Sequence, residues 1–167
     1  MSEWFRLLTQ YLHVFTGILW LGGGFYAVLV QLPGVLAAPP ASRGPVVAQL
    51  APRQIRYILR VAEVTIVTGL LNLFATGRGQ QLLDLGQRWS IALILGILLA
   101  LALYGLVRGQ LVPVTERMLA LGPKAAGGDA AAGAEVGRLI ERLKMLGRVQ
   151  IAIGALIILA MVIARLS

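Results

Sequence analysis

Four long apolar runs set the strongest limit on what this chain can fold into. They cover residues 7–32, 55–76, 89–112 and 146–166. A helix of about 20 residues crosses the ~30 Å hydrocarbon core of a bilayer, because it rises ~1.5 Å per residue. In lipid the backbone must form its hydrogen bonds within the chain, so we expect these runs to be helices and not strands.

The composition agrees with a membrane protein of a single domain. The chain has 167 residues, of which 58% are hydrophobic and 13% are charged, and this is too apolar for an average soluble protein. It has no cysteine, which excludes disulfides, thiolate metal sites and cysteine nucleophiles. We predict an all-α fold, in which residues 1–167 form one integral membrane domain built as a four-helix transmembrane bundle.

The distribution of basic residues predicts how the bundle sits in the membrane. Of the 15 Arg and Lys residues, eleven flank the first and third connections between the runs. The positive-inside rule then places both of these connections in the cytoplasm and both termini outside. The expected location is the inner (plasma) membrane, as a multi-pass protein. The basic residues form no contiguous patch with interleaved aromatics, so nucleic-acid binding is not expected.

The sequences of the two cytoplasmic connections predict different structures. Residues 33–52 hold five of the seven prolines, which indicates an extended, irregular loop. The third connection has an Ala/Gly-rich middle that we expect to be mobile. After it, apolar residues recur at helical spacing over 136–146, with charges between them. This segment predicts a cytoplasmic amphipathic helix at the headgroups, before the fourth transmembrane helix.

Glycines within the apolar runs predict where helices approach one another closely. Gly105 and Gly109 form a GxxxG pair, and Gly147 and Gly154 lie two turns apart in the last run. Small residues at such spacings let two membrane helices pack backbone to backbone. We expect all four to lie at helix–helix contacts.

The first run carries the one histidine of the chain on a distinctive helical face. His13, Gly17, Trp20, Gly24 and Gln31 recur at intervals that place them close to one side of an α-helix. A membrane imidazole can ligate haem iron or copper, or relay protons. It can equally be a neutral side chain that is hydrogen-bonded to a neighbouring helix. Trp20, near mid-bilayer, could stack on a flat ligand or simply pack.

The predicted topology brings other polar or metal-ligating side chains to matching depths. Asn72 and Met161 lie in the same outer half of the bilayer as His13, and a His/Met pair suits haem iron or cuprous copper. One histidine and a few methionines cannot build a relay of several copper sites within one chain. A strong metal site would need backbone groups, an exogenous ligand or a second protomer.

Glu63 is an ionisable residue inside the second run. An intramembrane carboxylate is a functional-site hypothesis by default. The ordinary alternatives are an ion pair with Arg60, three residues earlier, or snorkelling toward the cytoplasmic surface. A catalytic base for a lipid-soluble substrate is a further reading, although no second catalytic group is evident beside Glu63. The sequence does not decide whether the protein is an enzyme.

Most of the chain resembles a known group of small membrane proteins, including its third run after a short loop and the basic stretch before its last run. The residues that carry the resemblance are His13, Trp20, Gly22, Gly23 and Pro33 in and after the first run, Arg53, Arg56 and Arg60 at the start of the second, and Thr68, Gly69 and Leu70 within it. With these residues the chain resembles the copper-resistance protein D family and the related HemJ-type protoporphyrinogen oxidases. The former are associated with copper movement across the inner membrane. The latter oxidise a haem precursor and resemble haem b binders that use the first-helix histidine.

Two hypotheses of function follow. The first is a protein that handles haem b or copper at an outer-half site around His13. Trp20, Gly17 and Gly24 would then contact the cofactor, and Met161 would be a second metal ligand. The second is a non-catalytic helical subunit of a larger membrane complex, without a cofactor. In either case the expected partners are the lipid bilayer and other membrane helices, either from further copies of the chain or from a larger complex.

Overall fold

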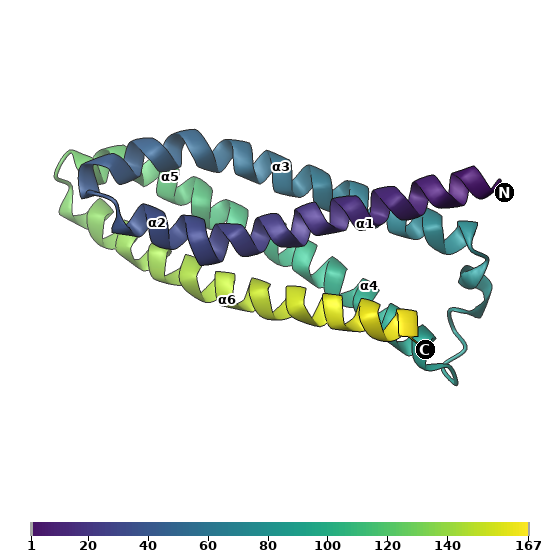
Figure 1. Cartoon of the computed structure of the whole chain (residues 1–167). Helices are drawn as coiled ribbons and strands as arrows, with labels where there is room; N and C mark the ends of the chain where they lie inside the picture. The colour runs from purple at the N-terminus through teal and green to yellow at the C-terminus, as the bar shows by residue number, and fades with distance from the viewer. Residues whose placement is uncertain (1, 167) are drawn as a thin grey trace.

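The protein consists of long helices that lie side by side. The computed structural model describes residues 2–166, and this range contains helices and turns but no strand. The elements in chain order are α1 (Glu3–Tyr26), η1 (Ala27–Gln31), α2 (Leu32–Ala37), α3 (Pro40–Ala75), η2 (Arg78–Gln81), α4 (Arg88–Leu106), η3 (Val107–Leu111), α5 (Val112–Ala126) and α6 (Ala130–Leu166). Because α1, η1 and α2 are continuous, as are α4, η3 and α5, the chain forms four rods (Figure 1). All four are long and apolar enough to cross a membrane. The predicted all-α four-helix bundle is confirmed.

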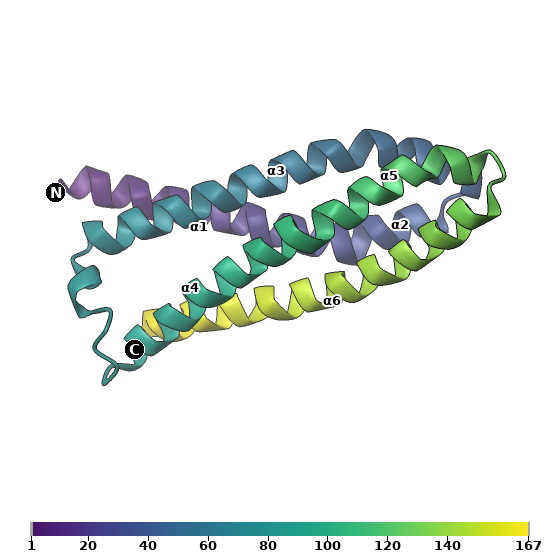
Figure 2. The same cartoon turned by 180° about the vertical axis from the view of Figure 1, so that it is seen from behind.

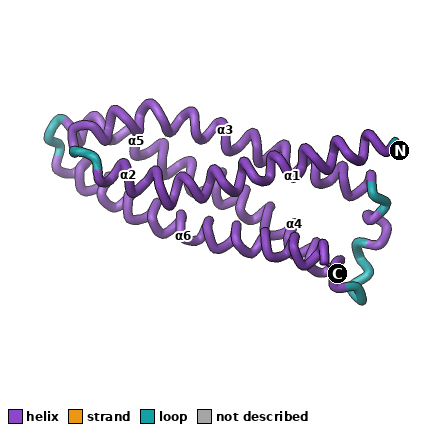
Figure 3. Tube along the Cα trace, viewed as in Figure 1, coloured by secondary structure: helices purple, strands orange, loops and turns teal. Residues whose placement is uncertain are grey.

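The four rods form two antiparallel hairpins. In the first hairpin α1 packs along α3, and in the second α4 and α5 pack along α6 (Figures 1 and 2). The hairpins contact each other less extensively than their own helices do. Both termini lie at one end of the molecule, which we call the termini end (Figure 3). The turns at 38–39 and 127–129 lie at the other, which we call the basic end because most Arg and Lys residues flank these turns. That the termini end faces outward stays a prediction.

Two prolines explain why the first and third rods each contain a five-residue π-helical segment. Proline has no N–H, and in an α-helix its ring clashes with the carbonyl four residues earlier. The π segments η1 and η3 end two residues before Pro33 and Pro113. In η1 the N–H of Leu32 donates to the carbonyl of Ala27, five residues back, and η3 ends with an equivalent bond. This local widening lets both rods continue through the proline.

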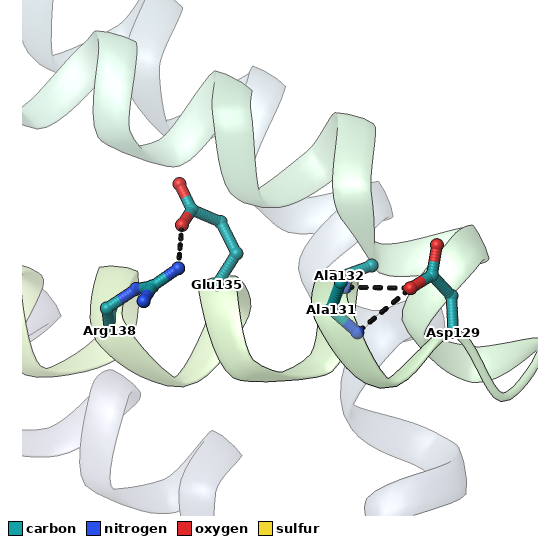
Figure 4. A network of polar contacts seen from close by, with 5 residues as sticks. All are labelled: Asp129, Ala131, Ala132, Glu135 and Arg138. Carbon is teal, nitrogen blue, oxygen red and sulfur yellow. Dashed lines mark hydrogen bonds and ion pairs between the residues drawn. The ribbon is translucent and has the colours of Figure 1, made fainter.

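The turn between α5 and α6 consists of residues 127–129 only, and these residues favour ending one helix and starting the next. Gly127 follows the last residue of α5, and Gly128 adopts a φ of 92°, which only glycine reaches without strain. The carboxylate of Asp129 then accepts hydrogen bonds from the N–H groups of Ala131 (2.9 Å) and Ala132 (3.0 Å), which caps the start of α6 (Figure 4).

The main apolar core lies where the hairpins meet. Its buried members are Trp20, Ile58, Leu59, Ala62, Leu103, Val107, Val112 and Ile157, from all four rods. A second cluster joins α5 to the first half of α6 and consists of Val114, Leu121, Ala132, Leu139 and Leu146. The basic-end half of the second hairpin therefore has a core of its own.

Two expectations for the connections need correction, and a third is confirmed in part. Residues 40–52, predicted as irregular, form the first turns of α3, and only residues 38–39 interrupt the helices there. The Ala/Gly-rich middle of the third connection is helical except at residues 127–129. The amphipathic segment 136–146 is helical and runs into the last transmembrane helix, as predicted, and it packs against α5. Its place at the headgroups stays a prediction.

Glycines bring the two hairpins together. A Cβ on Gly154 of α6 would lie 2.7 Å from Cε1 of Phe25 in α1, and a Cβ on Gly147 would lie 2.9 Å from Cγ1 of Val28 in η1. A side chain at either position would force these helices apart, so the predicted helix contacts at Gly147 and Gly154 are confirmed.

The GxxxG pair behaves differently. A Cβ on Gly105 or Gly109 would meet nothing within 4 Å. The pair therefore makes no close helix contact within residues 2–166 and forms an open strip on α4 and η3. A contact with a helix of another chain stays a prediction.

The two kinds of glycine allow a matched test of the packing between hairpins. Gly154→Ala should lower the free energy of unfolding by about 1–3 kcal/mol, because the added methyl overlaps the Phe25 ring. Gly105→Ala, the control, should leave it unchanged or raise it by about 0.5–1 kcal/mol, because alanine is the better helix former. Denaturation in detergent, followed by tryptophan fluorescence, measures both. Equal effects of the two substitutions would contradict the packing described here.

Candidate functional site

His13 lies half-buried in the seam between α1 and α3, in the termini-end half of the first hairpin. Its Nδ1 is 2.9 Å from the carbonyl oxygen of Thr65. A carbonyl oxygen can only accept, so Nδ1 carries the hydrogen and donates it. In the neutral imidazole the lone pair is then on Nε2. This arrangement, in which a backbone carbonyl fixes the other ring nitrogen, is typical of histidines that ligate metals.

Gly69 makes room for the imidazole. A Cβ at this position would lie 2.7 Å from Cε1 and 2.9 Å from Nδ1 of His13. Any side chain here would displace the ring from the Thr65 carbonyl. The absence of a side chain at Gly69 thus decides the orientation of His13.

Threonine hydroxyls hold the same seam together next to His13. The Thr65 hydroxyl donates to Oγ1 of Thr16 at 2.9 Å, and the Thr16 hydroxyl donates to the carbonyl of Leu12 at 2.7 Å. Both threonines are buried, at 7% and 8% exposure. Satisfied hydrogen bonds between membrane helices of this kind stabilise one relative position of the helices. The seam therefore presents His13 on a fixed scaffold.

An amide pair lies one helical turn from His13 toward the termini end. The side-chain N–H of Asn72 donates to Oε1 of Gln10 at 2.6 Å. The carbonyl oxygen Oδ1 of Asn72 is buried and has no hydrogen-bond partner in the described chain. A buried acceptor without a donor is energetically unfavourable. This position therefore suits a water molecule or a ligand that donates a hydrogen bond.

The structure brings only some of the predicted site residues together. Gly17 lies beside His13 in the same seam, where a Cβ would be 3.6 Å from the methyl group of Thr65. Trp20 lies deeper, in the main core, at 4% exposure. Gly24 faces another helix, since a Cβ there would overlap the side-chain amide of Gln150 in α6.

Met161 belongs to the other hairpin. Its terminal methyl group lies against Gly96 of α4, where a Cβ would be only 2.6 Å away. His13 contacts α3, whereas Met161 fills the contact between α4 and α6. Matching depth along the bundle therefore does not by itself make these two side chains neighbours.

Glu63 links the two hairpins instead of pairing with Arg60. The Tyr104 hydroxyl of α4 donates to Oε1 of Glu63 in α3 at 2.8 Å. Within residues 2–166 no ion pair joins Glu63 to Arg60, so that alternative for Glu63 is not what the structure shows. Glu63 lies nearer the basic end than His13 and belongs to a separate polar contact.

Sequence reasoning missed the roles of Gln10 and Thr16. Thr9, His13 and Thr16 recur at spacings of four and three residues, which is a polar face along α1. Their partners on α3 could be found only once the pairing of α1 with α3 was known.

These features define the class of protein. Four helices are long and apolar enough to cross a membrane, and the chain is an integral membrane protein of the multi-pass helical class. Within residues 2–166 no group of three or more His, Cys, Asp or Glu side chains lies together. In comparisons with known proteins, no family model, no curated protein and no solved structure matches the chain.

The geometry around His13 can be tested through its tautomer. Gly69→Ala should displace the imidazole and break its bond to Thr65, because the methyl group would overlap the ring. The chain has one histidine, so ¹⁵N-histidine labelling gives a single side-chain spectrum. The unmodified protein should show the Nδ1–H tautomer, and Gly69→Ala should show a mixture of tautomers. Gly22→Ala, where a Cβ meets nothing within 4 Å, is the control and should not change the spectrum.

Proposed function

We propose that this membrane protein handles haem b or copper, with Nε2 of His13 as the protein ligand. The hydrogen bond from Nδ1 of His13 to the Thr65 carbonyl is the observation that supports the proposal, because it directs the lone pair onto Nε2. The resemblance of the first two runs to the copper-resistance protein D family and the HemJ-type oxidases suggests the two candidate cofactors. Imidazole is a common ligand of both haem iron and copper.

The donor set fits a site with one protein ligand. His13 is fixed by a carbonyl, and Oδ1 of Asn72, which has no partner within residues 2–166, lies one turn away, where it can accept a hydrogen bond from a water or an exogenous ligand. Met161 would become a second ligand only if the hairpins moved or if two copies of the chain met. The cofactor would supply the redox or ligand-exchange chemistry, and His13 would hold it in the termini-end half of the bilayer. The positive-inside rule places that half outward in the plasma membrane.

An absorption spectrum with metal analysis tests the proposal on protein purified without a histidine tag. Haem or copper(I) should bind at about one equivalent per chain or per dimer, and His13→Ala should weaken binding at least tenfold. Gly69→Ala should weaken it by about 10–100-fold, which is the usual effect of losing the group that orients a ligating histidine.

Met161→Leu separates the alternatives for the second ligand. It removes the thioether at similar volume, so it should leave binding unchanged if His13 acts alone. Binding that survives His13→Ala at full strength, or a protein that takes up neither haem nor copper, would contradict the proposal.

A second candidate is a helical subunit of a larger membrane complex, and the open strip at Gly105 and Gly109 favours it. Within residues 2–166 nothing lies within 4 Å of a Cβ at either glycine, whereas glycines at such spacing commonly contact another membrane helix. A stoichiometric partner should then copurify and remain bound after His13→Ala, while Gly105→Leu should release it. Loss of the partner on His13→Ala, with retention on Gly105→Leu, would contradict this candidate.

A further inference from the structure

A shallow groove lies between α1, η1 and α3, away from His13. Its volume is about 280 Å³. Its lining includes Gly23, Tyr26, Gln31, Arg53, Gln54 and Tyr57. Gly23 is ten residues from His13 along the rod, which is about 15 Å in a helix. The groove is therefore separate from the seam around His13.

The length of α3 indicates that the groove lies at the depth of the lipid headgroups. Arg53 is 22 residues before Ala75, the last residue of α3, and this corresponds to about 33 Å along the helix. That length is close to the ~30 Å thickness of the hydrocarbon core. Tyr26 and Tyr57 line the same groove and are exposed at 58% and 44%, as tyrosines are at membrane interfaces.

The polar rim of the groove has unused hydrogen-bond donors. Nη1 of Arg53 donates to the backbone carbonyl of Gln49 at 2.6 Å, whereas Nε and Nη2 have no protein acceptor within residues 2–166. Gln31 donates to Oε1 of Gln54 at 2.7 Å, which ties η1 to α3 and leaves the amide N–H groups of Gln54 free. The rim therefore offers a guanidinium and an amide as hydrogen-bond donors.

The charge around the groove favours an anion. Residues 40–62 of α3 contain four arginines and no acidic residue. The carboxylate that follows, Glu63, is engaged by Tyr104 of the other hairpin. Guanidinium groups form strong, charge-assisted hydrogen bonds with phosphate. The floor of the groove beside Gly23 and Ile58 is apolar and suits a hydrocarbon chain.

We propose that this groove binds an anionic phospholipid from the leaflet at the basic end. The phosphate lies against Arg53 and the free amide of Gln54, and the start of an acyl chain lies along Gly23 and Ile58 between the two tyrosines. Basic grooves between membrane helices at this depth are recognised by anionic headgroups.

Native mass spectrometry with defined lipids tests this proposal. The detergent-solubilised protein should retain phosphatidylglycerol about tenfold better than phosphatidylethanolamine with the same acyl chains. Arg53→Gln should remove this preference, since one charge-assisted hydrogen bond contributes about a tenfold difference. Arg148→Gln is the matched control. It removes the same charge from an exposed position on α6, outside the groove, and should keep the preference.

Additional measurements in the same experiment identify the ligand and distinguish this proposal from the one for His13. Glycerol phosphate in excess should not displace the lipid if the acyl chain contributes, whereas displacement would overturn the lipid assignment in favour of a free phosphate. Equal loss of the preference in Arg53→Gln and Arg148→Gln would overturn the assignment of the lipid site to this groove and indicate general charge attraction.

Dimers that persist when no lipid is bound and dissociate on Arg53→Gln would overturn the lipid proposal in favour of a second copy of the chain in the groove. His13→Ala should leave lipid retention unchanged, so failure of the haem or copper proposal would not affect this one.

Discussion

The structure depends on one constraint, which is that every backbone polar group in lipid must find its partner within the chain. The chain meets it with rods that continue even where proline removes a donor. At Pro33 and Pro113 the helix widens into a π segment. Pro45 and Pro52 lie in the basic-end part of α3, and they leave the carbonyls of Ala41 and Ala48 without their helical donor at residues that are exposed. The prolines thus mark where the rods change geometry, not where they end.

The fold was largely predictable, because long apolar runs leave few alternatives in lipid. The connections were not predictable. A high content of proline and glycine indicates a loop only where tertiary packing and helix capping do not favour a helix. Residues 40–52 stay helical because they extend a rod that packs on α5. The Ala-rich start of α6 is helical because alanine has the highest helix propensity and Asp129 caps the first turn. Tertiary packing and one capping side chain outweighed the local composition.

The candidate site was predictable in part. Helical spacing placed His13 and Gly17 on one face, but the atoms that orient the imidazole come from Thr65 and Gly69, 52 and 56 residues further along. They could be identified only from the pairing of α1 with α3. Met161 shows the opposite error, because equal depth suggested a neighbour of His13 and the hairpin arrangement places it against Gly96. Depth follows from topology, whereas contact depends on which helices pair.

The four rods are much longer than the hydrocarbon core of a bilayer is thick. Each rod therefore lies partly in lipid and partly in water. α6 has 37 residues and is about 55 Å long, against ~30 Å of hydrocarbon. Its charges, including the pairs Glu135–Arg138 and Glu141–Lys144, lie on the basic-end side except for Arg165 at the termini end, and residues 149–164 have none. Salt screens the charges in the half of α6 that lies in water, whereas the half in hydrocarbon has no charges for it to screen between residues 149 and 164. Because α6 is one unbroken helix, a displacement of its charged half is transmitted to Gly154, where α6 contacts Phe25 of α1 in the uncharged half.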